Sequence, residues 1–144
     1  MQVSVLLQVK GHDVVTVRPE TTITDAVATM TEHRIGAVVV TTDATTIVGV
    51  LSERDVMTGL AAHGGDALDR TVADLMTTQV VTCQPDTTVE QLMATMTELR
   101  VRHVPVVVDG ELAGVVSIGD VVKDRISVLE HETEALHNYI SNPY

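Results

Sequence analysis

The sequence contains an internal duplication. Residues 14–40, VVTVRPETTITDAVATMTEHRIGAVVV, align without a gap with residues 80–106, VVTCQPDTTVEQLMATMTELRVRHVPV, and many of the aligned positions are identical. Further along, IVGVLSERDV at 47–56 aligns with LAGVVSIGDV at 112–121. A repeat this long exceeds the usual solenoid unit, and only two copies fit into 144 residues. The duplication therefore predicts two small domains that face each other across a pseudo-two-fold axis.

Both copies predict the same order of elements. A β-branched run that ends at a proline predicts a strand, and a threonine three residues ahead of Asp or Gln predicts the start of a helix. Two further β-branched runs predict a pair of strands joined by a turn, and a Ser-x-x-Asp sequence begins a second helix. Each unit is therefore expected to be βαββα. The predicted strands are 14–17, 37–41 and 47–51 in the first copy, and 80–83, 104–108 and 112–116 in the second.

The predicted fold class is α/β (α+β), with two βαββα units and an extended C-terminal helix. A short helical stretch is expected before each unit, and the glycine-containing link at 62–70 predicts a mobile loop. After Asp120 the chain is polar and helical, with a sparse apolar stripe that is typical of packing on a partner chain or another helix. The expected domains are residues 1–66, 67–126 and, for the C-terminal helical tail, 127–144.

Composition narrows the classes of partner. Nine Lys and Arg against 20 Asp and Glu give a net charge of −11, which is the wrong sign for neutralising nucleic-acid phosphates. Phe and Trp are absent, so the core must be aliphatic and stacking platforms for single-stranded nucleic acid are missing. The apolar runs are far shorter than the ~20 residues that span a bilayer, and no signal-peptide pattern begins the chain. We expect a soluble cytoplasmic protein that binds neither nucleic acid nor membrane.

The sequence gives little support for catalysis or for a metal site. The motifs of a nucleophile elbow, a P-loop and a Rossmann turn are all missing. Cys83 is the single cysteine and takes the place of Val17 in the other copy, so we expect a small core residue. His131 and His137 are six residues apart, whereas a zinc-binding helix needs a spacing of four. We expect no catalytic residue and no metal ligand.

Two Ser-x-x-Asp sequences stand at the predicted strand-to-helix junctions. Ser52 and Asp55 in the first copy correspond to Ser117 and Asp120 in the second, although the residues between them differ. The serine can cap the helix, and the aspartate on the first turn can accept two hydrogen bonds from a vicinal diol. Either pair alone would be explained by a capping box. Because both copies keep the pair, we expect a binding role.

The duplicated pattern resembles a tandem pair of CBS domains, together called a Bateman module, over about residues 3–126. The resemblance implies βαββα repeats that enclose clefts for adenosine-containing ligands, with AMP, ADP, ATP, NAD and S-adenosylmethionine as candidates. It also implies that Asp55 and Asp120 accept ribose hydroxyls and that the strand entering each repeat lies against the base. The residues implied are Val14, Thr16, Val80 and Thr82 at the base, and Ser52 and Ser117 near the ribose or phosphate.

The resemblance further implies where phosphate would be held. In the second copy Arg102-His103-Val104-Pro105 is similar to the basic pair before a Val-Pro or Ile-Pro that holds phosphate in family members. Its counterpart in the first copy begins Gly36-Ala37 and has neither charge nor proline. Arg54 is implied to reach a phosphate in the neighbouring site. Arg34 and Arg100 follow the first helix in both copies and could contact phosphate, although a structural role is the expectation. Lys10 is a further candidate for ligand contact.

These expectations describe a regulatory module without catalysis. It would bind AMP or another adenine nucleotide such as NAD, ADP or ATP, form a homodimer, and transmit occupancy to a partner protein. The alternative is a dimeric interaction scaffold whose clefts stay empty. A third possibility, an enzyme acting on the nucleotide, would need a base, and His103 is the one candidate among the expected site residues. A cleft that holds a diol with a carboxylate should prefer ribose to deoxyribose.

Overall fold

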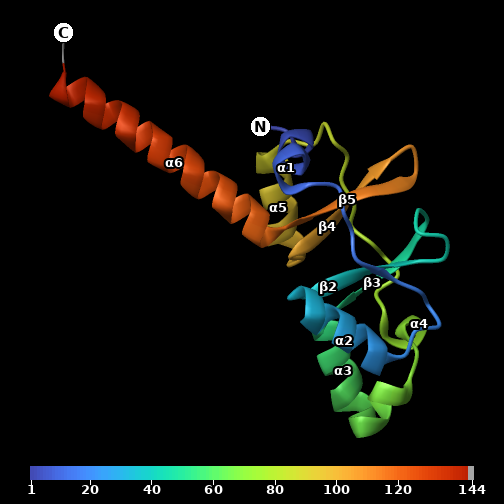
Figure 1. The fold of residues 1–144 in the computed structure, drawn as a ribbon. Coiled ribbons are helices and arrows are strands. Elements are labelled where there is room, and N and C mark those ends of the chain that lie inside the picture. The colour runs from blue at the N-terminus through green and yellow to red at the C-terminus, as the bar shows by residue number, and fades with distance from the viewer. Residues whose placement is uncertain (143–144) are drawn as a thin grey trace.

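The computed structural model describes residues 1–142 as two α/β units that lie against each other, with a long helix extending away from them (Figure 1). The helices are α1 (Val3–Lys10), α2 (Ile23–His33), α3 (Glu53–His63), the 3-10 helix η1 (Gly64–Asp69), α4 (Val72–Leu75), α5 (Val89–Leu99) and α6 (Ile118–Ser141). The strands are β1 (Thr16–Val17), β2 (Ala37–Thr41), β3 (Ile47–Ser52), β4 (His103–Val108) and β5 (Glu111–Ser117). The predicted fold class is confirmed.

The two repeats have small, equivalent sheets. In the first, β1 runs parallel to β2, which is antiparallel to β3. In the second, β4 and β5 form an antiparallel pair, and the strand predicted at 80–83 is reduced to one parallel bridge between Cys83 and Val106. The turn between β4 and β5 is at Asp109-Gly110, with φ values of 51° and 80°. Positive φ at both positions is what a two-residue type I′ hairpin requires.

Each repeat has its own aliphatic core, as the composition predicts. The cores are built from the apolar faces of the helices and the inward-facing strand residues. The first core contains Val17, Ile23, Ala26, Met30, Val38, Val40, Leu51 and Val72. The second contains Val3, Leu6, Leu7, Cys83, Val89, Leu92, Met96, Val104, Val106, Val116 and Val121.

The two short helices are exchanged between the repeats. Helix α1 precedes the first repeat in the sequence, yet its apolar side chains lie in the second core, and the Val3 N–H donates to the Thr87 carbonyl at 2.8 Å. Helix α4 precedes the second repeat but buries Val72 in the first core, where its N–H donates to the Thr21 carbonyl at 2.7 Å. The chain therefore crosses between the repeats after α1 and again after α4. The boundaries 1–66 and 67–126 follow the sequence repeat and stay a prediction.

The link and the tail differ from each other in packing. The link at 62–70, predicted to be a mobile loop, is instead the end of α3 followed by η1, with Ala67 fully buried and Thr24 Oγ1 donating to the Leu68 carbonyl at 2.8 Å. The tail predicted at 127–144 is helical to Ser141, and residues 143–144 lie outside the described part. No helix within residues 1–142 is both long enough and apolar enough to cross a membrane.

Candidate functional site

Two adjacent clefts open between the repeats. The first has a volume of about 460 Å³ and the second about 360 Å³. Each is lined by the start of one repeat's second helix together with a crossing segment and a strand start from the other half of the chain. Gly36, Ala37, Val50 and His103 line both clefts. The duplication thus places equivalent groups in two neighbouring sites.

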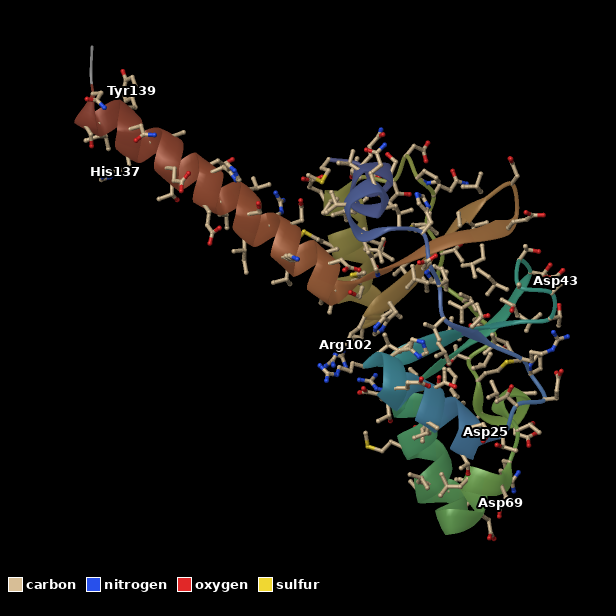
Figure 2. All side chains as sticks on the ribbon, in the orientation of Figure 1. Asp25, Asp43, Asp69, Arg102, His137 and Tyr139 are labelled. Atoms are coloured by element: carbon tan, nitrogen blue, oxygen red, sulfur yellow. The ribbon has the colours of Figure 1, made fainter. Side chains whose placement is uncertain are left out.

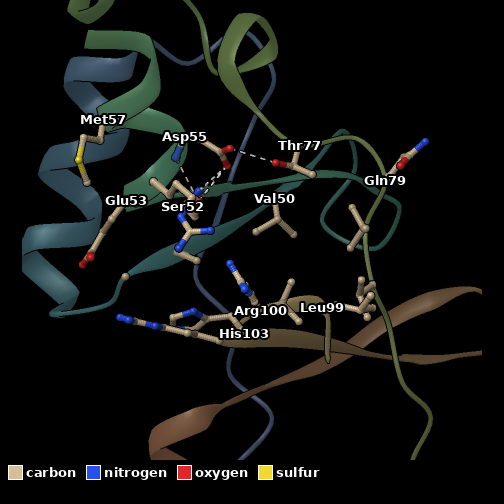
Figure 3. A pocket seen from close by; sticks show the side chains of 17 residues that line it. Val50, Ser52, Glu53, Asp55, Met57, Thr77, Gln79, Leu99, Arg100 and His103 are labelled. Atoms are coloured by element: carbon tan, nitrogen blue, oxygen red, sulfur yellow. Dashed lines mark hydrogen bonds between the residues drawn. The ribbon is translucent and has the colours of Figure 1, made fainter. Parts of the chain in front are cut away.

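The first cleft contains Ser52 and Asp55 at the start of α3. Asp55 Oδ2 accepts from the Ser52 N–H at 2.9 Å and Ser52 Oγ accepts from the Asp55 N–H at 3.2 Å, which is a capping box (Figure 3). Ser52 Oγ also donates to Asp55 Oδ2 at 3.0 Å. Asp55 Oδ1 accepts from Thr77 Oγ1 at 3.0 Å, and Thr77 belongs to the crossing segment after α4. A carboxylate has about four lone-pair sites, so these bonds orient Asp55 and leave acceptor capacity for a further donor.

The second cleft contains the equivalent pair with a different outside partner. Asp120 Oδ2 accepts from the Ser117 N–H at 2.8 Å, from Ser117 Oγ at 2.9 Å and from Lys10 Nζ at 2.6 Å. Burial acts to raise the pKa of Asp120, but the hydrogen bonds from Lys10 and Ser117 outweigh it and hold the pKa below its usual value. The carboxylate of Asp120 is therefore ionised at neutral pH and already paired with an ammonium group of the same chain.

Positive charge gathers in the first cleft. Arg54, Arg100 and Arg102 all line it, and Arg102 lies where the two repeats meet (Figure 2). Across residues 1–142, none of these three guanidinium groups forms an ion pair. Glu53 and Asp55 line the same cleft, but neither pairs with these guanidinium groups in the described part of the chain, so the three are available for an anion.

Arg100 and its counterpart Arg34 follow helices α5 and α2 in a left-handed conformation, each with a φ of 54°. Glycine usually takes this position, and a left-handed conformation costs another residue about 1–2 kcal/mol. Arg100 lines the first cleft and Arg34 the second. The structure therefore places at the clefts two arginines for which the sequence left open phosphate contact or a structural role.

His103 is half-buried between the two clefts. Burial lowers its pKa, the nearby Lys10 and Arg102 cations act in the same direction, and Asp120 and Glu53 oppose them. Its imidazole is therefore mainly neutral at neutral pH. A Cβ added at Gly36 would lie 3.4 Å from His103 Cε1 and 3.1 Å from Glu53 Oε1. Glycine at this position keeps the space between the clefts open.

Most of the residues that the sequence predicts for the site are brought together. Those that line a cleft are Val14, Gly36, Ala37, Ser52, Arg54, Asp55, Val80, Arg102, His103, Pro105, Ser117 and Asp120. Thr16, Thr82 and Val104 line neither cleft. Val104 is fully buried in the second core because strand alternation turns its side chain away from those of its two neighbours. Thr16 and Thr82 lie beyond the crossing segments, which reach the clefts at 13–15 and 79–81.

Other lining residues were not predicted. In the first cleft these include Glu53, Met57, Thr77, Gln79, Val81 and Leu99. In the second they include Asp13, Val15, Ile35 and Val115. Most of them come from the crossing segments and helix ends, whose approach depends on the exchanged short helices.

Groups associated with covalent or metal chemistry lie elsewhere or are dispersed. Burial raises the pKa of the Cys83 thiol to about 11, and its side chain lies in the second core. Within residues 1–142 no three His, Cys, Asp or Glu side chains cluster in a way that could hold a metal ion. The polar groups that the clefts present include an aspartate and a serine in each and, in the first cleft, three guanidinium groups.

The fold and the clefts define a class of protein: a tandem pair of βαββα repeats with two clefts between them. The CBS domain family model matches residues 8–62 and 72–126, and the chain belongs to the CBS domain family. The resemblance expected from the duplication is confirmed.

Relatives and solved structures agree with this membership. The chain is 36% identical over 127 residues to the mitochondrial CBS domain-containing protein CBSX3 of Arabidopsis thaliana, covering 85% of this chain and 62% of that protein. A crystal structure of a CBS-domain containing protein from Agrobacterium tumefaciens is similar with a TM-score of 0.84 and 48% identity, covering 87% of this chain and 99% of that one. This chain therefore spans less than two thirds of the Arabidopsis relative and nearly all of the Agrobacterium chain.

A more distant structure shares the fold. The CBS domain pair of protein MJ0100, solved in complex with 5′-methylthioadenosine and S-adenosyl-L-methionine, has a TM-score of 0.75 and 22% identity. The match covers 85% of this chain and 98% of that one. At this identity the likeness concerns the arrangement of the two repeats.

Proposed function

We propose that this chain is a regulatory module that binds an adenine nucleotide in its first cleft and signals occupancy to a partner protein. The observation that carries the proposal is that one cleft holds the Asp55 carboxylate and three arginines that form no ion pair among residues 1–142. A carboxylate is complementary to a ribose diol, and guanidinium groups are complementary to phosphate. AMP is the simplest ligand with both groups, and NAD, ADP and ATP share them.

The apolar part of the first cleft suits the base. Val50, Val80 and Val81 line it together with the carboxylate and the arginines. None of the residues that line this cleft is Phe, Tyr or Trp, so adenine would contact mainly aliphatic side chains and be read by backbone groups. Adenosine ligands occupy the CBS pair of MJ0100, and the shared fold supports the same class of ligand here.

The second cleft is less suited to the same ligand. Lys10 already donates to Asp120, so a ribose diol would have to compete with an ammonium group at 2.6 Å. The second cleft is also lined by fewer arginines than the first. We therefore expect the first cleft to fill at lower nucleotide concentration than the second.

A dimeric interaction scaffold with empty clefts is the second candidate. The Lys10–Asp120 pair favours it for the second cleft, because that carboxylate is satisfied without a ligand. The two functions differ in one measurable respect, which is whether any ribonucleotide stabilises the chain. For either function, we propose that the protein resides in the cytoplasm.

A thermal-shift series tests the proposal. AMP, ADP, ATP, NAD and 2′-deoxy-AMP are added to the full chain, and a ligand at 100 times its Kd should add about 2.7 kcal/mol to the free energy of unfolding. We expect stabilisation by a ribonucleotide and less by 2′-deoxy-AMP. No shift with any nucleotide would support the scaffold, and loss of nucleotide on chromatography would support an enzyme.

The variant Asp55→Asn tests the role of the carboxylate. Loss of a charge-assisted hydrogen bond, worth about 1.5–3 kcal/mol, should weaken nucleotide binding by about tenfold to a hundredfold. Asp55 also belongs to the capping box of α3, so its replacement could reduce stability as well as binding. A control variant must therefore remove a helix-capping carboxylate that lies outside the clefts. Asp74→Asn does this, because Asp74 accepts from the Thr71 N–H at the start of α4 and lines neither cleft. Equal affinities for the two variants would contradict the proposed role of Asp55.

A further inference from the structure

Helix α6 extends well past the body of the molecule. Its first turns contact α5, β5 and α1, and Val121 is buried in the second core. From Leu129 to Ser141 all of its residues are exposed, and the helix extends into open space (Figure 1). Helical segments of fewer than ~12–15 residues are marginal in water when nothing packs on them. The far half of α6 therefore needs a partner surface.

The apolar side chains of α6 have a heptad spacing. Positions 122, 126, 129, 133, 136 and 140 alternate steps of four and three residues, and all but Thr133 are apolar. In heptad notation Ile126, Thr133 and Ile140 are a positions, and Val122, Leu129 and Leu136 are d positions. The five apolar side chains are 50–75% exposed. Val121 and Val128 face the body, so this seam is a different side of the helix.

We propose that α6 pairs with α6 of a second copy of this chain in a parallel two-stranded coiled coil. The three a positions are all β-branched and two of the three d positions are leucine, a combination that favours two strands. No residue of this seam lines either cleft. It gives the homodimer expected from the sequence a definite contact.

The charges beside the seam select the parallel orientation. Parallel chains place each g residue beside the e residue five positions later in the second copy. Arg125 then lies beside Glu130 of the second copy, and Glu132 beside His137 of the second copy. In the antiparallel arrangement that keeps the same core layers, Glu130 would face Glu130 and Glu132 would face Glu132. Arg125 lies 3.4 Å from Glu90 in the same chain, but that pair is exposed and worth little.

The same helix connects the seam to the second cleft. Asp120 stands on the first turn of α6 and lines that cleft, while Leu129 and Leu136 lie further along the same helix. A change in the direction of α6 at the cleft would therefore be transmitted along a rigid element to the contact between copies.

Disulfide trapping tests the seam in the full chain. In a parallel coiled coil a d position meets the same residue of the second copy, so Leu136→Cys should form a disulfide-linked dimer on mild oxidation. Asn138→Cys is the matched control, because position 138 is an f position on the outside of the pair. We expect at least about tenfold more linked dimer from Leu136→Cys than from Asn138→Cys. The native Cys83 is buried, which keeps its own contribution small.

Two outcomes would overturn the proposal. Equal yields from Leu136→Cys and Asn138→Cys would show that the seam does not pair. A mixture of Leu136→Cys and Ile126→Cys chains that links mainly to each other would show an antiparallel pair. Circular dichroism gives a second readout: Leu129→Asp should lose helix content at the far end of α6, whereas Asn138→Asp should not. Equal helix content in both would also overturn it.

Discussion

Lys10 makes the two clefts chemically different. Thr77 and Lys10 occupy corresponding positions. Thr77 follows α4 and donates to Asp55, whereas Lys10 is the last residue of α1 and donates to Asp120. In the first cleft the donor is a neutral hydroxyl, and in the second it is an ammonium group. Asp55 is therefore oriented without being neutralised, whereas Asp120 carries a counter-ion from its own chain.

Lys10→Met should change how stability depends on pH. The pKa of Asp120 is held below its usual value of 3.8, so the ionised form is favoured in the folded chain. This contribution to the free energy of unfolding is present above pH 3.8 and is lost as pH falls through the folded pKa. We expect the difference between wild type and Lys10→Met to be greatest at neutral pH and to shrink in acid. Urea unfolding across the pH range measures it.

Arg18→Met is the matched control for that experiment. It also removes a cation with a carboxylate partner, Glu20, but both side chains of that pair are well exposed. Exposed pairs contribute little, so this variant should differ little from wild type at any pH. An identical pH dependence for Lys10→Met and Arg18→Met would contradict the account of Asp120.

The sequence predicted those site residues whose positions depend on short sequence motifs. Ser52 and Asp55 form a capping box within one helical turn, so their spacing was enough to place them together. Lys10 and Thr77 reach the carboxylates only because short helices dock on the opposite repeats. No local pattern reports such a long-range contact, so the partners of the two aspartates could not be predicted.

At the scale of elements, the docking of α1 and α4 decides the shape of the clefts. Each short helix sets the position of the crossing segment that follows it, and those segments line the clefts at 13–15 and 79–81. Close packing allows this docking: a Cβ at Gly114 would lie 2.8 Å from Leu7 Cδ2, and one at Gly49 would lie 2.6 Å from Met76 Sδ. Glycines in β5 and β3 therefore leave room for Leu7 of α1 and for Met76, which directly follows α4.

Gly114→Ala should destabilise the fold by overpacking against α1. Overpacked core positions cost about 1–3 kcal/mol, and urea unfolding would measure the loss. Gly65→Ala is the control, because a Cβ there meets nothing within 4 Å. Shortening Leu7 to Ala should itself destabilise the chain but should make the added Gly114→Ala less costly. Equal stabilities for Gly114→Ala and Gly65→Ala would show that α1 does not pack on β5.

The elements themselves were largely predictable, and the exceptions have a tertiary cause. Capping residues and apolar periodicity located α2 and α5, and Asp109-Gly110 located the hairpin. The predicted strand at 80–83 is one bridge, because most of that segment serves as a crossing between repeats. The link at 62–70 is ordered because Ala67 is buried where η1 packs beside α2.

At the scale of the whole molecule, duplication explains both the clefts and their difference. Two equivalent repeats produce two adjacent sites that share Gly36, Ala37 and His103. Sequence differences between the two copies place more arginines in the first cleft. In the second cleft, the Asp120 carboxylate is paired with Lys10. The proposed function therefore depends on one property of the molecule: the first cleft holds a ribonucleotide through its diol and its phosphate.

A crystal structure of the full chain with saturating AMP tests that claim most directly. The account predicts the nucleotide in the first cleft, with a ribose hydroxyl within hydrogen-bond distance of Asp55 and the phosphate beside Arg54, Arg100 or Arg102. AMP bound outside the clefts, or both clefts empty at saturation, would contradict it.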